Sequence, residues 1–75
     1  MVGTSMKENI NQKLGRKIKE LRRKQGITQE KLAELAKTGY KYLQRIEGKT
    51  PPDVRLTTIE KLAEALNIAP AKLLD

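Results

Sequence analysis

Apolar residues recur every three or four positions along most of the chain, which is the spacing that places side chains on one face of a helix. The first such run covers about residues 8–25, with these apolar positions: Ile10, Leu14, Ile18 and Leu21. Gly26 follows it directly and suits the left-handed residue that often ends a helix. No segment shows the alternation of apolar and polar residues that is typical of a strand. The pattern therefore predicts an all-α fold.

Two short amphipathic runs come next, separated by residues 37–39. The first is expected to be a helix over residues 29–36, because Thr28 before it is a suitable N-cap. Its buried side is expected to consist of four apolar residues: Leu32, Ala33, Leu35 and Ala36. The second run is expected to be a helix over residues 40–47, with Gly39 as its N-cap.

The prolines at positions 51 and 52 interrupt the helical pattern, because proline has no amide proton and blocks the preceding turn. The helical spacing resumes in a fourth segment, expected over residues 55–66. Its start is ambiguous in sequence, since the apolar period begins at Leu56 while Thr57 and Glu60 also match a capping box.

A short fifth helix is expected at the end of the chain, because Asn67 suits the left-handed residue after the fourth helix and Pro70 suits a first turn. Seventy-five residues then make one compact five-helix domain around an aliphatic core, near the size at which one core is just sufficient. This domain is assigned to residues 7–75. Residues 1–5 are polar and unpatterned and precede a second methionine, Met6. We interpret residues 1–6 as a disordered start, in which residues 1–5 are either a cloning remnant or an alternative start ahead of a native Met6.

The composition excludes several classes of function. The chain has no Cys and no His, so neither a disulfide framework nor a metal or cofactor is expected. Its longest apolar stretches are two or three residues, far below the roughly 20 that span a bilayer, so no membrane is expected and a cytoplasmic protein is the default. No catalytic residue is expected either, because the only serine is Ser5 and no pair of carboxylates lies near a suitable base.

The net charge of +7 is concentrated in two segments. Residues 7–24 carry eight basic and two acidic side chains, and residues 37–50 carry four basic and one acidic. Residues 25–36 and 51–75 each have a net charge of −1. Basic side chains can simply solvate helix faces. Two basic segments on either side of a neutral one favour an anionic partner instead.

The segment over residues 40–47 carries unusual side chains for a solvated helix. Its apolar edge is thin, consisting of Leu43 and Ile46. The other positions hold donors that read base edges and phosphates: Tyr40, Lys41, Tyr42, Gln44 and Arg45. A solvated helix would more usually carry Glu and Ala there. This face therefore indicates double-stranded DNA as the partner.

Three stretches together resemble a known family: LGRKIKELRRKQGITQEKLAELA (14–36), YLQRIEGK (42–49) and LTTIEKLAEALNIAPAKLL (56–74). They resemble the helix-turn-helix domain of the lambda-type phage repressors and the XRE/Cro-like regulators. The resemblance implies a lambda-repressor-like fold in which the second and third helices form the helix-turn-helix and the third enters the major groove. It also implies sequence-specific DNA binding by a small transcriptional regulator, with repression as the expected role.

The resemblance assigns individual residues to DNA. Gln29 matches a glutamine that typically touches the sugar-phosphate backbone or an outer base. The recognition positions of the family match four residues: Tyr40, Lys41, Gln44 and Arg45. Positions that often meet phosphates match Tyr42 and Lys49. For Tyr42, partial burial with the hydroxyl at the surface is an equal alternative, whereas Tyr40 favours contact with DNA.

Other residues are expected to be structural or peripheral. Arg22 and Glu47 match a pair that forms a buried salt bridge in some phage repressors, and a structural role is expected for both. In the basic first helix, Arg23 and Lys24 are the residues expected to reach phosphates.

The sequence departs from the family in the turn between the second and third helices. The family usually has a glycine with positive φ where this chain has Lys37. Either Lys37 accepts a left-handed conformation at a cost of about 1 kcal/mol, or the turn shifts toward Gly39.

Two expectations concern protein partners. A protein-interaction module on the same fold, such as an antitoxin whose surface also covers a toxin, is the alternative function. Helix-turn-helix modules usually pair on palindromic sites, so a weak homodimer through residues 66–75 is also expected. Its apolar surface is expected to come from the C-terminal turn, which is too small an element to be fully buried against the fourth helix alone: Ile68, Leu73 and Leu74.

Overall fold

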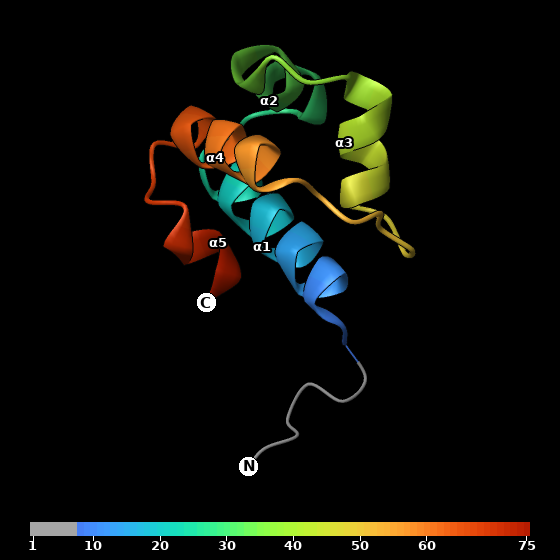
Figure 1. The fold of residues 1–75 in the computed structure, drawn as a ribbon. Helices are drawn as coiled ribbons and strands as arrows, with labels where there is room; N and C mark the ends of the chain where they lie inside the picture. Colours follow the sequence, from blue (N-terminus) through green and yellow to red (C-terminus); the bar gives the residue numbers. More distant parts are fainter. Residues whose placement is uncertain (1–7) are drawn as a thin grey trace.

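The computed structural model describes residues 8–75, which fold into five helices (Figure 1). In chain order these are α1 (Ile10–Lys24), α2 (Gln29–Ala36), α3 (Tyr40–Ile46), α4 (Leu56–Ala65) and α5 (Ala71–Leu74). No strand occurs among the described residues, so the predicted all-α, five-helix fold is confirmed. Residues 1–6, interpreted above as a disordered start, lie outside the described part of the chain.

Local side-chain hydrogen bonds fix where the first two helices begin. Asn9 forms a capping box with Gln12, in which each side chain accepts the other residue's backbone N–H, at 2.8 and 3.1 Å. The sequence contained this signal, but the helix start was expected near residue 8. The Thr28 hydroxyl accepts the N–H of Lys31 at 3.0 Å, so the predicted cap of α2 is confirmed. Gly26 has φ of +70° and ends α1 as expected.

The turn between α2 and α3 reverses at Lys37 and is not shifted toward Gly39. Lys37 adopts the left-handed conformation (φ 55°, ψ 44°), and the N–H of Thr38 donates to the carbonyl of Ala33 at 3.0 Å. Gly39 is extended (φ −70°, ψ 140°) because it serves as the N-cap of α3. The chain must therefore reverse before Gly39, and Lys37 accepts a strain of about 1 kcal/mol.

The helix α4 begins without a side-chain cap. Its N-cap is Arg55, in an extended conformation, and the alternative capping box of Thr57 and Glu60 is not formed. Leu56 is consequently the first helical residue, and it is 77% exposed rather than part of the apolar face.

One core runs through all five helices. It consists of twelve buried apolar residues: Leu14, Ile18, Leu32, Ala33, Ala36, Leu43, Ile46, Ile59, Leu62, Ala63, Leu66 and Leu73. The expected burial of Leu35 is wrong, because this side chain is 48% exposed. It projects roughly 100° around α2 from the centre of the buried face, beyond the reach of α3 and α4.

The expectation for Leu73 is also wrong. Its side chain is completely buried, so it contributes no apolar surface to a dimer. The reason is that α5 packs against α1 as well as α4, and the sequence interpretation considered only α4 (Figure 1). Of the three residues expected at a dimer interface, only Leu74 (41% exposed) and the half-buried Ile68 reach the surface.

Gly15 allows α1 and α3 to approach each other closely. It is buried in the middle of α1, and a Cβ atom there would overlap the backbone carbonyl oxygen of Ile46 at the end of α3. The obstacle is backbone, which cannot rotate away as a side chain can. The position of α3 against the bundle therefore depends on the absence of a side chain at residue 15.

Gly15→Ala is expected to lower the free energy of unfolding by about 1–3 kcal/mol, because the added methyl group forces the two helices apart. Urea denaturation followed by circular dichroism measures this change. Inside a helix the same substitution ordinarily stabilises by up to about 1 kcal/mol, so the expected sign is opposite to the usual one. A gain in stability would show that α1 and α3 do not approach this closely.

Candidate nucleic-acid interface

The helix α3 lies at the edge of the bundle, with α1 and α2 on its inner side (Figure 1). Only Leu43 and Ile46 of α3 are buried, both completely. The predicted recognition residues lie on the remaining surface of the helix and are exposed: Tyr40, Lys41, Gln44 and Arg45. The structure therefore brings these four residues together on one outer face.

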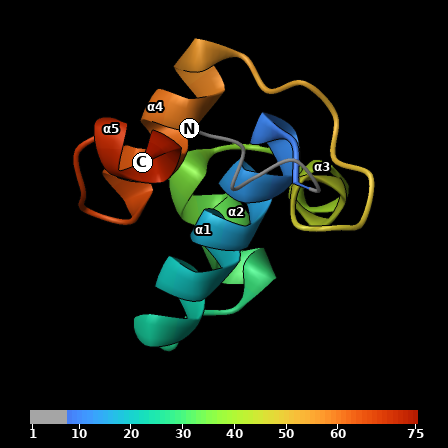
Figure 2. The ribbon, with the colours of Figure 1, turned by 90° about the horizontal axis from the view of Figure 1, so that it is seen from below.

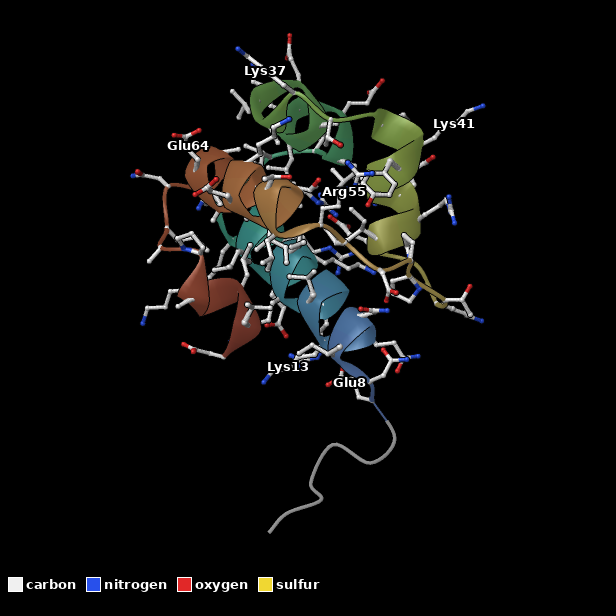
Figure 3. The ribbon with its side chains drawn as sticks, viewed as in Figure 1. Glu8, Lys13, Lys37, Lys41, Arg55 and Glu64 are labelled. Carbon is white, nitrogen blue, oxygen red and sulfur yellow. The ribbon has the colours of Figure 1, made fainter. Side chains whose placement is uncertain are left out.

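Three of these side chains are available to a ligand. Lys41, Gln44 and Arg45 make no side-chain hydrogen bond or ion pair with any other residue between positions 8 and 75. Figure 3 shows the Lys41 side chain pointing from α3 away from the body of the protein. A lysine, an amide and a guanidinium supply the donors and the acceptor that base edges in a major groove require.

Tyr42 lies differently from its neighbours on α3. Its ring is half-buried and packs against the core cluster. This position agrees with the alternative interpretation of Tyr42, in which the side chain is partly buried against the core.

A buried ion pair joins α1 to the end of α3, as predicted. The guanidinium of Arg22 donates to both carboxylate oxygens of Glu47 at 2.9 Å, and its third nitrogen donates to the carbonyl of Ile27 at 2.9 Å. The side chain of Glu47 is 1% exposed and that of Arg22 is 10% exposed. Both groups are therefore almost fully removed from water, where the loss of either partner is costly.

Gln29 belongs to the same network. Its Nε2 donates to Oε1 of Glu47 at 3.0 Å, and the residue is half-buried at the start of α2. Gln29 was expected to contact DNA, and its bond to Glu47 was not predicted because the two residues are 18 positions apart in the sequence. The bond holds the Gln29 amide between the start of α2 and the end of α3. The second Nε2 proton and the Oε1 atom of Gln29 itself keep their hydrogen-bonding capacity for another ligand.

Lys49 lies exposed in the loop between α3 and α4. Two hydrogen bonds attach this loop to the beginning of α1: Gln12 Nε2 donates to the carbonyl of Lys49 at 3.3 Å, and Asn11 Nδ2 donates to Asp53 at 2.7 Å. Sequence reasoning missed both contacts. The partners are about 40 residues apart, and polar residues on a helix carry no local signal of such a contact.

The basic residues of α1 divide into different groups in space. Arg16 is paired with Glu8 at 2.9 Å and with Glu20 at 3.3 Å, so it is not a free cation. Its hydrogen bond lowers the pKa of Glu8 and raises the pKa of Arg16 itself. Arg23 and Lys24 are exposed beside α5, whereas α3 lies on the other side of α1 (Figure 2). Arg23 and Lys24, which were expected to reach phosphates, therefore do not share the outer face of α3.

No helix among residues 8–75 has the length and apolar character to cross a membrane. The same residues contain no cluster of three or more His, Cys, Asp or Glu side chains placed to hold a metal ion.

The sequence pattern of the helix-turn-helix family matches residues 18–73, which is most of the chain. This protein belongs to that helix-turn-helix family, and its resemblance to the XRE/Cro-like regulators is confirmed. None of the curated proteins matches the chain.

Two solved structures are similar to this protein. One is the restriction-modification controller protein C.AhdI from Aeromonas hydrophila, with 38% sequence identity and a TM-score of 0.79; the match covers 84% of this chain and 94% of that one. The other is the hypothetical transcription factor NHTF from Neisseria, with 28% identity and a TM-score of 0.84; the match covers 91% of this chain and 77% of that one. The fold and the family together support DNA-binding transcriptional regulation.

Arg22→Met is expected to lower the free energy of unfolding by about 3–5 kcal/mol, because Glu47 would remain buried with its main partner removed. Replacing both Arg22 and Glu47 with Met should restore most of that loss, since no unpaired charge is then left inside. Thermal and urea denaturation of the two variants measure the difference.

Arg16→Met is the matched control, because it removes an arginine whose ion pairs are largely solvated. Its effect on the free energy of unfolding should be much smaller than that of Arg22→Met. Equal losses for Arg16→Met and Arg22→Met would show that the buried pair has no special role in stability.

Proposed function

We propose that this protein is a small transcriptional regulator that binds double-stranded DNA in a sequence-specific manner by placing α3 in the major groove. The observation that carries the proposal is the outer face of α3, where Lys41, Gln44 and Arg45 are exposed and have no partner among residues 8–75. Membership of the helix-turn-helix family supports it. So do the two similar structures, a restriction-modification controller protein and a transcription factor.

The proposed roles follow from side-chain chemistry and position. Lys41 and Arg45 suit guanine, whose O6 and N7 accept from a cation, and Gln44 suits adenine. Tyr40 extends this recognition face at the start of α3, where it is 42% exposed. Gln29 and Lys49 lie at the start of α2 and after α3 and would contact the DNA backbone. Tyr42 would hold α3 in place and offer its hydroxyl to a phosphate.

We further propose repression as the regulatory effect, because a protein of this size bound at a promoter can block access by occupancy alone. The proposed role is non-catalytic. It requires no cofactor, and it places the protein in the cytoplasm with the DNA that it binds.

The test begins with selection of bound duplexes from a random pool, followed by binding measurements on the selected site and on an unrelated duplex. Lys41→Ala and Arg45→Ala should each weaken binding to the selected site by about 1–3 kcal/mol and weaken binding to the unrelated duplex less, because base contacts provide the discrimination. Fluorescence anisotropy provides the affinities.

Lys72→Ala is the control and should weaken DNA binding less than Lys41→Ala or Arg45→Ala. It also removes one positive charge, but from α5, which lies on the other side of α1 from α3 (Figure 2). The wild-type affinity should also fall steeply with salt, with a log–log slope of roughly −4 to −5 if about five phosphates are neutralised. A flat salt response would argue against DNA as the partner. If either substitution lowered the affinity for both duplexes equally, that residue would contact phosphates and not bases.

We also propose that two copies form a weak two-fold dimer through the C-terminal region. One short recognition helix buries little surface, and two copies about 34 Å apart would read both halves of a palindrome. Because Leu73 is part of the core, the proposed contact now rests on Leu74, which is 41% exposed at the end of the chain.

Leu74→Asp is expected to leave a folded monomer that binds a full palindromic site much more weakly, because the second copy no longer adds to the affinity. Leu73→Asp cannot serve as this test, since it would place a charge in the core. Sedimentation velocity with and without DNA measures the assembly, and Leu35→Asp on α2 is the control for an exposed leucine. A wild-type monomer bound singly to the full site would contradict the dimer.

A further inference from the structure

A groove of about 870 Å³ lies between the second half of α1 and the segment that joins α4 to α5. Its apolar floor is formed by Leu21, Ile68 and Ala69. None of the residues proposed to contact DNA lines it. Figure 2 shows why: α5 and α3 lie on opposite sides of α1.

The walls of the groove are held in place by the core and by one long-range hydrogen bond. Gln25 Nε2 donates to the carbonyl of Leu66 at 2.8 Å, which fastens the end of α1 to the end of α4. The N–H of Ile68 donates to the carbonyl of Ala63 at 2.9 Å, and the buried Leu73 anchors α5 on the other wall. The groove therefore exists without a ligand.

The rim of the groove is strongly basic. It carries four cations, Lys17, Arg23, Lys24 and Lys72, and a single acid, Glu20. Glu20 is already engaged by Arg16 at 3.3 Å. Because the apolar floor lies between cationic rims, a matching ligand needs both apolar groups and negative charges.

The shape of the groove favours a helix over a small molecule. Lys17, Leu21 and Lys24 follow one another along a single face of α1, over two helical turns or about 10 Å. The groove is open on one side, whereas sites for small molecules usually enclose most of the ligand. A second helix laid along such a stripe would place apolar residues from successive turns on the floor.

We propose that this groove docks an amphipathic, acidic helix of a partner protein. Leucine-like side chains of that helix would rest on Leu21 and Ile68, and its carboxylates would meet Lys17, Lys24 and Lys72. A second copy of this protein does not fit, because it would bring two basic rims together, and like charges in contact oppose binding. Lys72 and Leu74 also project about 200° apart on α5, so a dimer contact made by Leu74 does not cover the Lys72 rim of the groove.

The proposal adds a protein partner to the proposed DNA-binding function, and the two are measured separately. The probe is a fluorescein-labelled peptide of about 16 residues, made of Glu, Ala and Leu with the leucines on one helical face. Anisotropy with the full-length protein gives its affinity. The double variant Lys17→Glu/Lys24→Glu should weaken peptide binding about tenfold or more, because it places like charges opposite the peptide.

Ala69→Arg separates shape from charge, since it fills the groove and adds a positive charge to it. Ala69 is exposed, so the fold should persist, which circular dichroism checks. This variant should also weaken peptide binding about tenfold. Lys61→Glu makes the same substitution as each half of the double variant, but on the exposed surface of α4, and it should change peptide binding less than about twofold. The peptide should bind equally well when the protein is saturated with its selected DNA duplex.

Four outcomes would overturn the proposal. The first is equally tight binding of a peptide with the same composition but dispersed leucines, which would show that peptide binding depends on charge alone. Lys61→Glu could weaken binding as much as the groove variants. Duplex DNA could displace the peptide, which would make the groove part of the DNA interface. Ala69→Arg could abolish self-association, which would make the groove a contact between copies of this protein.

Discussion

The bidentate pair of Arg22 and Glu47 is the interaction on which the arrangement of the helix-turn-helix depends. Arg22 comes from α1, and Glu47 caps the end of α3. The same carboxylate receives Gln29 from the start of α2, and the same guanidinium holds the carbonyl of Ile27 before α2. Three segments are thereby fixed around one buried charge pair. Such a pair contributes more to a defined geometry than to net stability, because desolvation offsets much of the attraction.

The helix α3 needs this support because it has little of its own. It is seven residues long, below the length at which an isolated helix is stable, and only two of its side chains are fully buried. Gly15 brings α1 against its backbone, the ring of Tyr42 packs on the core, and Glu47 fastens its end. These contacts occupy one side of α3. The opposite side remains available for long polar side chains, which a helix in a major groove requires.

The fold decides which of the basic residues share a surface. Along the sequence, the first helix is the most basic segment, and together with residues 37–50 it indicates an anionic partner. In the fold, Arg16 is neutralised by Glu8 and Glu20, and Arg23 and Lys24 face a groove beside α5. Exposed cations on α3 and in the following loop are Lys41, Arg45 and Lys49. The net charge of +7 therefore includes two separate basic surfaces, which lie on opposite sides of α1.

The sequence by itself determined the helices, their order and most of their ends. Thr28, Gly26 and Gly39 act within one turn of their own position, and the apolar period needs no knowledge of distant residues. The apolar period also gave the exposed face of α3, and the resemblance to phage repressors added the Arg22–Glu47 pair. Only the tertiary structure decided that Leu35 and Leu56 point outward, that Leu73 is covered by α1, and that Gln29 binds Glu47. Each of these depends on which helices pack together, because a side chain's burial is set by a neighbour distant in sequence.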